Sequence, residues 1–194
     1  MIRQQIAFGF NLLFVWVVII HFGANLFETL IIYPNIFHDI PRSLQTSVTF
    51  LAITGPRDFF MPVGILSMIA GIGVLIFSWR MRTPRYWILG GMIVIFAGEF
   101  LFSVIFFWPR NTIMFGDGLT VYSPEYLKQT AFEFQTIHWL RLALSATATI
   151  LAFIGFLKVY QNRMESARYL TRERLLPLKG PTPDSKLMNT EYYE

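Results

Sequence analysis

The sequence contains no cysteine. Disulfides, thiolate nucleophiles, iron–sulfur clusters and cysteine-ligated zinc sites are therefore excluded. Any chemistry must use histidine, carboxylate, arginine, asparagine or aromatic side chains. Histidine is scarce as well, since the chain has only three. Two of them, His21 and His138, fall in apolar segments, which excludes a histidine-rich di-iron hydroxylase.

Charged residues make up only 14% of the chain, whereas 54% of the 194 residues are hydrophobic. This composition is too apolar for a soluble domain of this length, so we expect an integral membrane protein. A helix needs about 20 apolar residues to cross the hydrocarbon core. Four stretches meet this length, at residues 6–33, 59–79, 86–108 and 137–159. We predict an all-α fold, an antiparallel four-helix transmembrane bundle formed by residues 1–160.

Basic residues are distributed unevenly around these segments, which predicts the orientation. One side would carry Arg3, three arginines of the second loop and seven basic residues at or after the fourth segment. The other side would carry Arg42, Arg57, Arg110 and Lys128. Because basic loops stay in the cytoplasm, we expect both termini there and the first and third loops outside, in a bacterial inner membrane. The formal charge of +4 thus reports topology, and we expect no nucleic-acid partner.

The two external loops are expected to form a compact cap. Pro41 suits the first position of a short helix over residues 41–52, which Gly55 and Pro56 would end. In the third loop, residues 116–118 read as a turn, and residues 123–125 as the start of the fourth helix.

Residues 161–194 are expected to form a basic, polar cytoplasmic tail. Their composition predicts disorder in isolation. Such a tail could contact partner subunits of a membrane complex or anionic lipid head groups.

Polar side chains interrupt the apolar segments. His21, Asn25 and Glu28 are spaced at i, i+4 and i+7, so they share one face of the first helix. Glu99 lies in the third segment, and His138 with Arg141 in the fourth. In lipid such groups must face the bundle interior, where they are usually paired or functional.

The cluster contains two acids but one arginine. Arg141 can pair with Glu28 or with Glu99, and the other acid must then be protonated, bound to a histidine or reached by a loop arginine. We interpret this surplus of acid as a site. The alternative is that buried pairs merely fix the helix register.

Four segments, "ANLFETLIIYPNIF", "TGPRDFF", "FFWPRNTIMF" and "HWLR", resemble the anthrone-oxygenase-like family of small four-helix membrane proteins, most of unknown function. The resemblance covers about residues 25–155. The positions that match the family pattern are Asn25, Glu28, Pro34, Pro109, Arg110, Asn111, Trp139 and Arg141. Characterised members are cofactor-independent oxygenases that convert a polyketide anthrone to an anthraquinone, which the resemblance implies as an analogy for this chain.

The first functional hypothesis is a membrane oxidoreductase or oxygenase acting on a lipophilic aromatic or quinone-like molecule. Such a molecule must lose a proton before it gives up electrons, so its site needs a base and a cation. The residues predicted to act in catalysis are His138, Arg141, Glu28 and Glu99. Those predicted to bind the molecule are His21, Asn25, Arg57, Arg110, Asn111 and Trp139. No cofactor is expected, although His21 and His138 could ligate a haem or, with a carboxylate, a metal.

The second hypothesis is a non-catalytic accessory subunit of a larger membrane complex. It predicts a closed, ion-paired core and an apolar outer face. An enzyme should instead show an open cavity that reaches Arg141. The sequence has no internal repeat and no inverted pair of broken helices, which disfavours an ordinary secondary transporter.

Overall fold

The structure, a computed structural model, describes residues 2–175, and helices with short connections make up this range, with no strand in it. The chain divides into two units, Met1–Val159 and Tyr160–Glu194. The candidate site lies wholly within the first unit.

Four helical segments are long and apolar enough to cross a membrane, as the sequence predicts. They cover Ile2–Phe37, Pro56–Ser78, Arg82–Gly116 and Pro124–Tyr169. Each contains one of the predicted stretches or nearly all of it, and the first, third and fourth are considerably longer than predicted.

The first segment comprises α1 (Ile2–Phe27), a π-helical stretch over Glu28–Ile32 and α2 (Tyr33–Phe37). A proline in an α-helix clashes with the carbonyl four residues earlier. Here a wider turn precedes Pro34, in which the Tyr33 N–H donates to the Glu28 carbonyl. The helix therefore continues through Pro34, where an end was expected.

In the third segment, too, a π-helical stretch ends two residues before a proline, Pro109. The segment comprises α5 (Arg82–Val94), π-helical stretches over Ile95–Leu101 and Ser103–Phe107, α6 (Trp108–Asn111) and most of a further π-helical stretch over Thr112–Asp117. Beyond the segment the helix continues as α7 (Gly118–Val121). The expected turn at residues 116–118 is wrong, because the chain is helical there. Met114 is buried, and the ring of Phe115 contacts that of Phe37. This packing outweighs the preference of the two glycines for a turn.

The connection between the first two membrane segments contains the predicted short helix, α3 (Arg42–Phe50). Leu44 is buried and anchors α3 to the apolar core at this end. Gly55 precedes α4 (Pro56–Ser78), and its N–H donates to the Asp58 carboxylate at 2.8 Å. Gly55 and Pro56 thus mark the start of α4, and α3 ends several residues earlier.

The last helix, α8 (Pro124–Leu175), begins where the sequence predicts. The Ser123 hydroxyl accepts from the Tyr126 N–H at 3.3 Å and caps this end. The expectation of disorder is wrong for residues 161–175, which are helical and contain neither glycine nor proline. The rest of the predicted tail, residues 176–194, lies outside the described residues.

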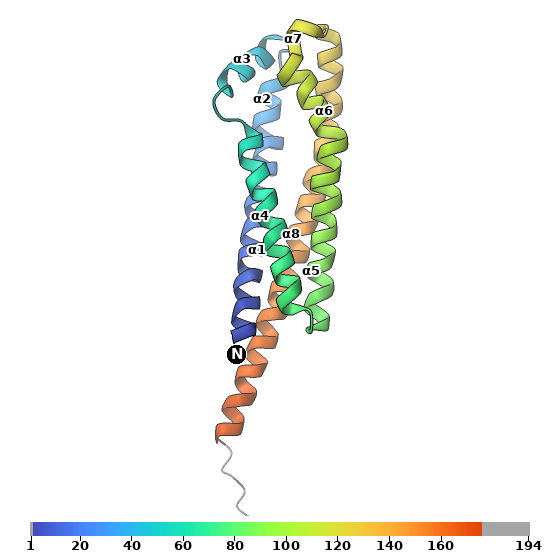
Figure 1. The fold of residues 1–194 in the computed structure, drawn as a ribbon. Coiled ribbons are helices and arrows are strands. Elements are labelled where there is room, and N and C mark those ends of the chain that lie inside the picture. The colour runs from blue at the N-terminus through green and yellow to red at the C-terminus, as the bar shows by residue number, and fades with distance from the viewer. Residues whose placement is uncertain (1, 176–194) are drawn as a thin grey trace, which may run out of the picture. The chain divides into compact units, whose positions relative to one another are not determined.

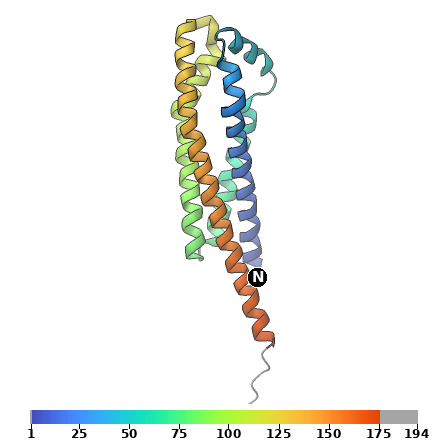
Figure 2. The ribbon, with the colours of Figure 1, turned by 180° about the vertical axis from the view of Figure 1, so that it is seen from behind.

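Within the first unit, α1 packs along α4, and α5 packs along α8 (Figures 1 and 2). The buried apolar side chains form two separate clusters. One includes Phe14, Val74, Ile88 and Ala152, and the other includes Leu44, Phe107, Leu127 and Phe134. Along α1, the third segment and α8, most of the buried polar residues lie between these clusters, and Asn11 and Thr130 are the exceptions.

Candidate functional site

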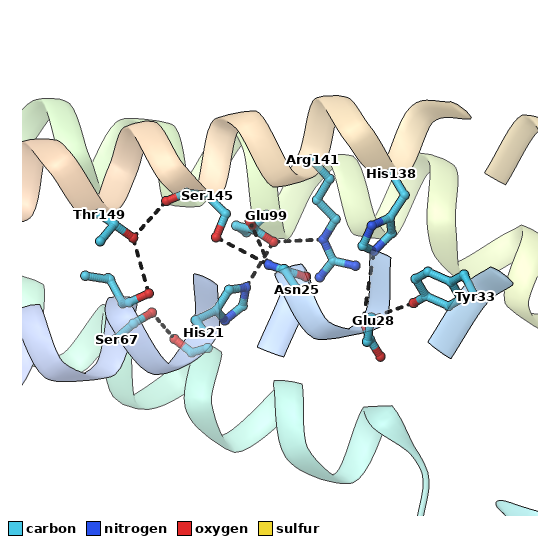
Figure 3. A network of polar contacts seen from close by, with 12 residues as sticks. His21, Asn25, Glu28, Tyr33, Ser67, Glu99, His138, Arg141, Ser145 and Thr149 are labelled. Carbon is cyan, nitrogen blue, oxygen red and sulfur yellow. Dashed lines mark hydrogen bonds and ion pairs between the residues drawn. The ribbon is translucent and has the colours of Figure 1, made fainter. Parts of the chain in front are cut away.

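Glu99 is the centre of the buried polar band between the two apolar clusters. Arg141 Nε donates to Glu99 Oε2 at 2.8 Å, and Asn25 Nδ2 donates to Glu99 Oε1 at 3.3 Å (Figure 3). His21 Nε2 lies 3.0 Å from Glu99 Oε2, an ion-pair distance, although it is misaligned for a hydrogen bond. α1 and α8 therefore both bind one carboxylate of the third segment.

Neighbouring side chains hold this ionic cluster in place. The Asn25 amide also donates to the Ser145 hydroxyl at 3.3 Å, one turn beyond Arg141. The Arg141 guanidinium lies 5.5 Å from the centre of the Phe60 ring and 5.1 Å from that of Phe107. Contacts of this kind stabilise a desolvated guanidinium. α4 thus contributes an aromatic side chain to the cluster, and Arg141 has a carboxylate partner within it.

Glu28 belongs to a second group of side chains, nearer to α2. Its Oε2 accepts a hydrogen bond from the Tyr33 hydroxyl at 3.0 Å and lies 3.9 Å from His138 Nε2 (Figure 3). The last distance is too long for a hydrogen bond. With Glu28 and Glu99 both ionised and Arg141 as the cation, these three side chains would carry a net charge of −1, which is costly inside a membrane.

The contacts of Thr29 determine which nitrogen of a neutral His138 ring carries the proton. The Thr29 hydroxyl donates its single hydrogen to the Asn25 carbonyl at 2.6 Å. It must therefore accept at its 2.9 Å contact with His138 Nδ1, which places the ring proton on Nδ1. Nε2 of a neutral His138 is then a proton acceptor.

His138 Nε2 has no hydrogen-bond partner although the side chain is 0% exposed. Buried polar atoms are rarely left unpaired, and those that are require an explanation. The ring is surrounded by Tyr33, Phe107 and Phe134, whose centres lie 4.7, 5.4 and 5.8 Å from its own. An unpaired base therefore lies within an aromatic shell.

A pocket of about 320 Å³ borders this base. Its polar lining includes Thr29, Tyr33, Gln135 and His138, and its other walls are Pro34, Phe37, His38 and Trp139. The pocket is enclosed by the first segment and α8. Arg141 is not among the lining residues, so the cavity stops one helical turn short of the ion pair.

Six of the predicted site residues come together in the polar band: His21, Asn25, Glu28, Glu99, His138 and Arg141. Trp139 borders the pocket instead. The catalytic and binding roles of these residues remain predictions.

The three remaining predicted residues, Arg57, Arg110 and Asn111, lie outside the band. Arg57 is exposed in the first turn of α4, and Asn111 ends α6. Arg110 pairs with Glu133 at 2.8 Å and packs on Phe106. Neither arginine reaches Glu28.

Sequence reasoning missed Thr29, Tyr33 and Gln135. Thr29 could have been found, because it follows Asn25 by four residues and continues the stripe that starts at His21. His38 is exposed and forms part of the pocket wall.

The buried histidines and carboxylates are the potential metal ligands of this region. Within residues 2–175, no three histidine or carboxylate side chains are grouped as a metal site. His21 Nε2 faces Glu99, and His138 Nδ1 is bound to Thr29. His138 Nε2 is the ring nitrogen that has no hydrogen-bond partner.

Comparisons with known protein families, with characterised proteins and with solved structures gave no match to this chain.

Proposed function

We propose that the chain is a membrane oxidoreductase or oxygenase-like protein that binds a lipophilic aromatic or quinone-like molecule beside His138. One observation carries this proposal: His138 Nε2 is buried and unpaired, and its ring lines a pocket. A hydroxyl group of a bound molecule would satisfy this atom.

The pocket suits a flat, mainly apolar ligand. Its volume of about 320 Å³ lies within the range of small-molecule sites, which are typically apolar with a few polar groups that fix orientation. Phe37 and Trp139 contribute aromatic side chains to its lining, and Thr29 and Gln135 contribute polar ones. Because the pocket lies between segments apolar enough to sit in a membrane, a ligand dissolved in lipid could reach it.

The chemistry begins with proton transfer. The ligand gives a proton to His138 Nε2, from a hydroxyl in the case of a quinol or from the methylene carbon in the case of an anthrone, and the resulting anion is readily oxidised. Arg141 would stabilise negative charge through space, since the pocket does not reach the guanidinium. Glu28 and Tyr33, which are already hydrogen-bonded, could pass the proton onward.

Molecular oxygen is the electron acceptor that the family resemblance suggests. A quinol would lose two electrons and two protons to O₂, giving a quinone and hydrogen peroxide. An anthrone would react with one O₂ at its methylene carbon, giving an anthraquinone and one water. Both reactions balance without a further reductant or cofactor.

Turnover of anthrone tests the proposal. Purified protein is supplied with anthrone in air, and anthraquinone formation and oxygen uptake are followed. We expect His138→Gln to reduce the rate by about 100-fold, a typical loss on removing a general base. His38→Gln, a matched change at the exposed rim, should retain most of the rate. An unchanged rate in His138→Gln would contradict the proposed role of His138.

Ligand binding is measured separately, through quenching of the tryptophan fluorescence of the wild type. The Trp139→Phe variant is the control, because quenching that comes from Trp139 should be missing there. Binding without turnover would favour a carrier or a different substrate. Absence of both would remove the support for an enzyme.

The closed Glu99–Arg141 pair favours the second candidate, an accessory subunit. An enzyme of the expected kind would open a cavity onto Arg141, and the pocket stops at His138. A native mass spectrum after gentle extraction distinguishes the two. Stoichiometric partner chains with an empty pocket would support the accessory subunit, and a bound aromatic molecule would support the oxidoreductase.

The proposal includes an orientation and a location. The arginines of residues 80–85 would face the cytoplasm together with both termini, and α2, α3 and α7 would cap the outer end. The pocket would then open toward the external side of a bacterial inner membrane.

A further inference from the structure

A second pocket lies at the opposite end of the first unit from the candidate site. Its volume is about 520 Å³, and its lining consists of Arg3, Ile72, Leu75, Ile76, Trp79 and Arg80. Two guanidinium groups thus share a groove with an aliphatic wall.

The structure holds Arg3 at this groove. Its Nε donates to the Phe77 carbonyl and its Nη2 to the Ile76 carbonyl, both at 3.2 Å. These carbonyls belong to the last turn of α4, where the backbone lacks helical partners and carries partial negative charge. Arg3 therefore caps α4, and within the described residues no ion pair with an acid neutralises its charge.

The two stretches of sequence that contribute the groove lining supply no acid. Residues 1–27 and 59–98 contain no aspartate or glutamate. They do contain Arg3, Arg80, Arg82 and Arg85. An anion from outside the bundle would therefore complement the charge of this groove.

The rest of the groove is apolar and faces outward. Ile72 and Ile76 are one turn apart on α4 and are 48% and 60% exposed, and Trp79 is 53% exposed. Exposed aliphatic residues on a membrane helix contact acyl chains, and tryptophan is typical of the head-group level. The groove thus runs from a basic end to an aliphatic wall, as a phospholipid does from phosphate to tail.

We propose that this groove binds an anionic phospholipid, with its phosphate between Arg3 and Arg80 and an acyl chain along Ile72 and Ile76. The site is independent of the candidate active site. It would fix α1 to the end of α4 through a bound lipid.

The test uses the full-length protein in detergent, with phosphatidylglycerol and phosphatidylcholine of identical acyl chains, and native mass spectrometry as the readout. We expect the wild type to retain phosphatidylglycerol preferentially. Arg80→Gln should lower its affinity about five-fold, as expected for one basic residue near an anionic lipid. Arg82→Gln removes the same charge two residues away, outside the groove lining, and should have little effect.

Arg3→Gln should lower the affinity similarly. Arg80→Gln is the decisive variant, because Arg3 also caps α4 and its loss could change the structure of the groove. Equal retention of the two lipids by the wild type would overturn the proposal. An equal loss of affinity in Arg82→Gln and Arg80→Gln would also overturn it. The lipid would then be attracted by the overall positive charge at this end of the bundle and not by the groove. Displacement of the lipid by millimolar inorganic phosphate would show that the groove binds the anion alone.

Discussion

Arg141 Nε and Glu99 Oε2 lie 2.8 Å apart in the interior of the bundle, and their side chains are only 11% and 6% exposed. This pair joins α8 to the third segment. Removing one partner of a buried pair leaves the other uncompensated, which is costly even where the intact pair adds little stability.

Arg141→Ala should therefore destabilise the protein in detergent by about 3 kcal/mol. Glu99→Gln should restore part of this loss in the double variant, because it removes the uncompensated carboxylate. Thermal unfolding of the two single variants and the double variant gives the coupling energy.

Glu28→Gln is the matched control for that cycle, because Glu28 accepts from Tyr33 and has no hydrogen bond to Arg141. The Glu28 cycle should be closer to additive. Equal coupling of Arg141 to both acids would contradict a specific pair with Glu99.

The Thr29 hydroxyl should control the protonation pattern of the His138 ring. We expect a neutral His138 to carry its proton on Nδ1, since Thr29 can only accept there. Thr29→Val keeps the shape of the side chain but removes the acceptor, so the Nε2–H form should become populated. Side-chain ¹⁵N NMR of histidine-labelled protein measures the two forms, and His21→Gln and His38→Gln assign the signals. A wild-type ring with its proton on Nε2 would contradict the assignment.

Gly73 should not tolerate a side chain. A Cβ atom there would lie 2.4 Å from Cδ1 of Phe10, at the contact between α4 and α1. Overpacking of this kind typically costs 1–3 kcal/mol, so we expect Gly73→Ala to lower the melting temperature by an amount equivalent to about 2 kcal/mol.

Gly64→Ala makes the same change in the same helix, where a Cβ would meet nothing within 4 Å. It should be neutral or slightly stabilising, because alanine is the better helix former. Phe10→Leu should partly rescue Gly73→Ala. If the two glycine variants melted alike, the close approach of Phe10 to Gly73 would be refuted.

The proposed orientation can be tested by cysteine labelling, because the chain has no cysteine of its own. Ile53, between α3 and α4, is 96% exposed, and Thr83 is exposed near the start of α5. In intact cells, Ile53→Cys should react with a membrane-impermeant thiol reagent and Thr83→Cys should react only after lysis. The reverse pattern would place both termini outside.

Much of the helical layout could be predicted from sequence, because apolar length is a local property. The start of α8 at Pro124 and the shared stripe of His21, Asn25 and Glu28 followed from capping and helical spacing. The acid that pairs with Arg141 could not be predicted, since it depends on how separate helices meet. The helical path beyond Gly116 was missed because burial of Met114 outweighs local turn preference.

Tyr33 shows the same limit within a single helix. In a regular α-helix, the residue beside Glu28 on the same face would be Ile32, four positions on. Tyr33 is five positions on, and the wide turn before Pro34 brings its hydroxyl to the Glu28 carboxylate. Helical spacing read from sequence assumes a uniform turn and therefore misses this contact.

The wide turns at Glu28–Ile32 and Ser103–Phe107 also couple chain length to rotation. Each residue of an α-helix advances the side-chain direction by about 100°. Deleting one residue from the first of these turns would thus do more than shorten the helix. It would rotate His21 and Asn25 by about that angle relative to Tyr33, carrying them away from Glu99 while every apolar segment kept its ability to span the membrane.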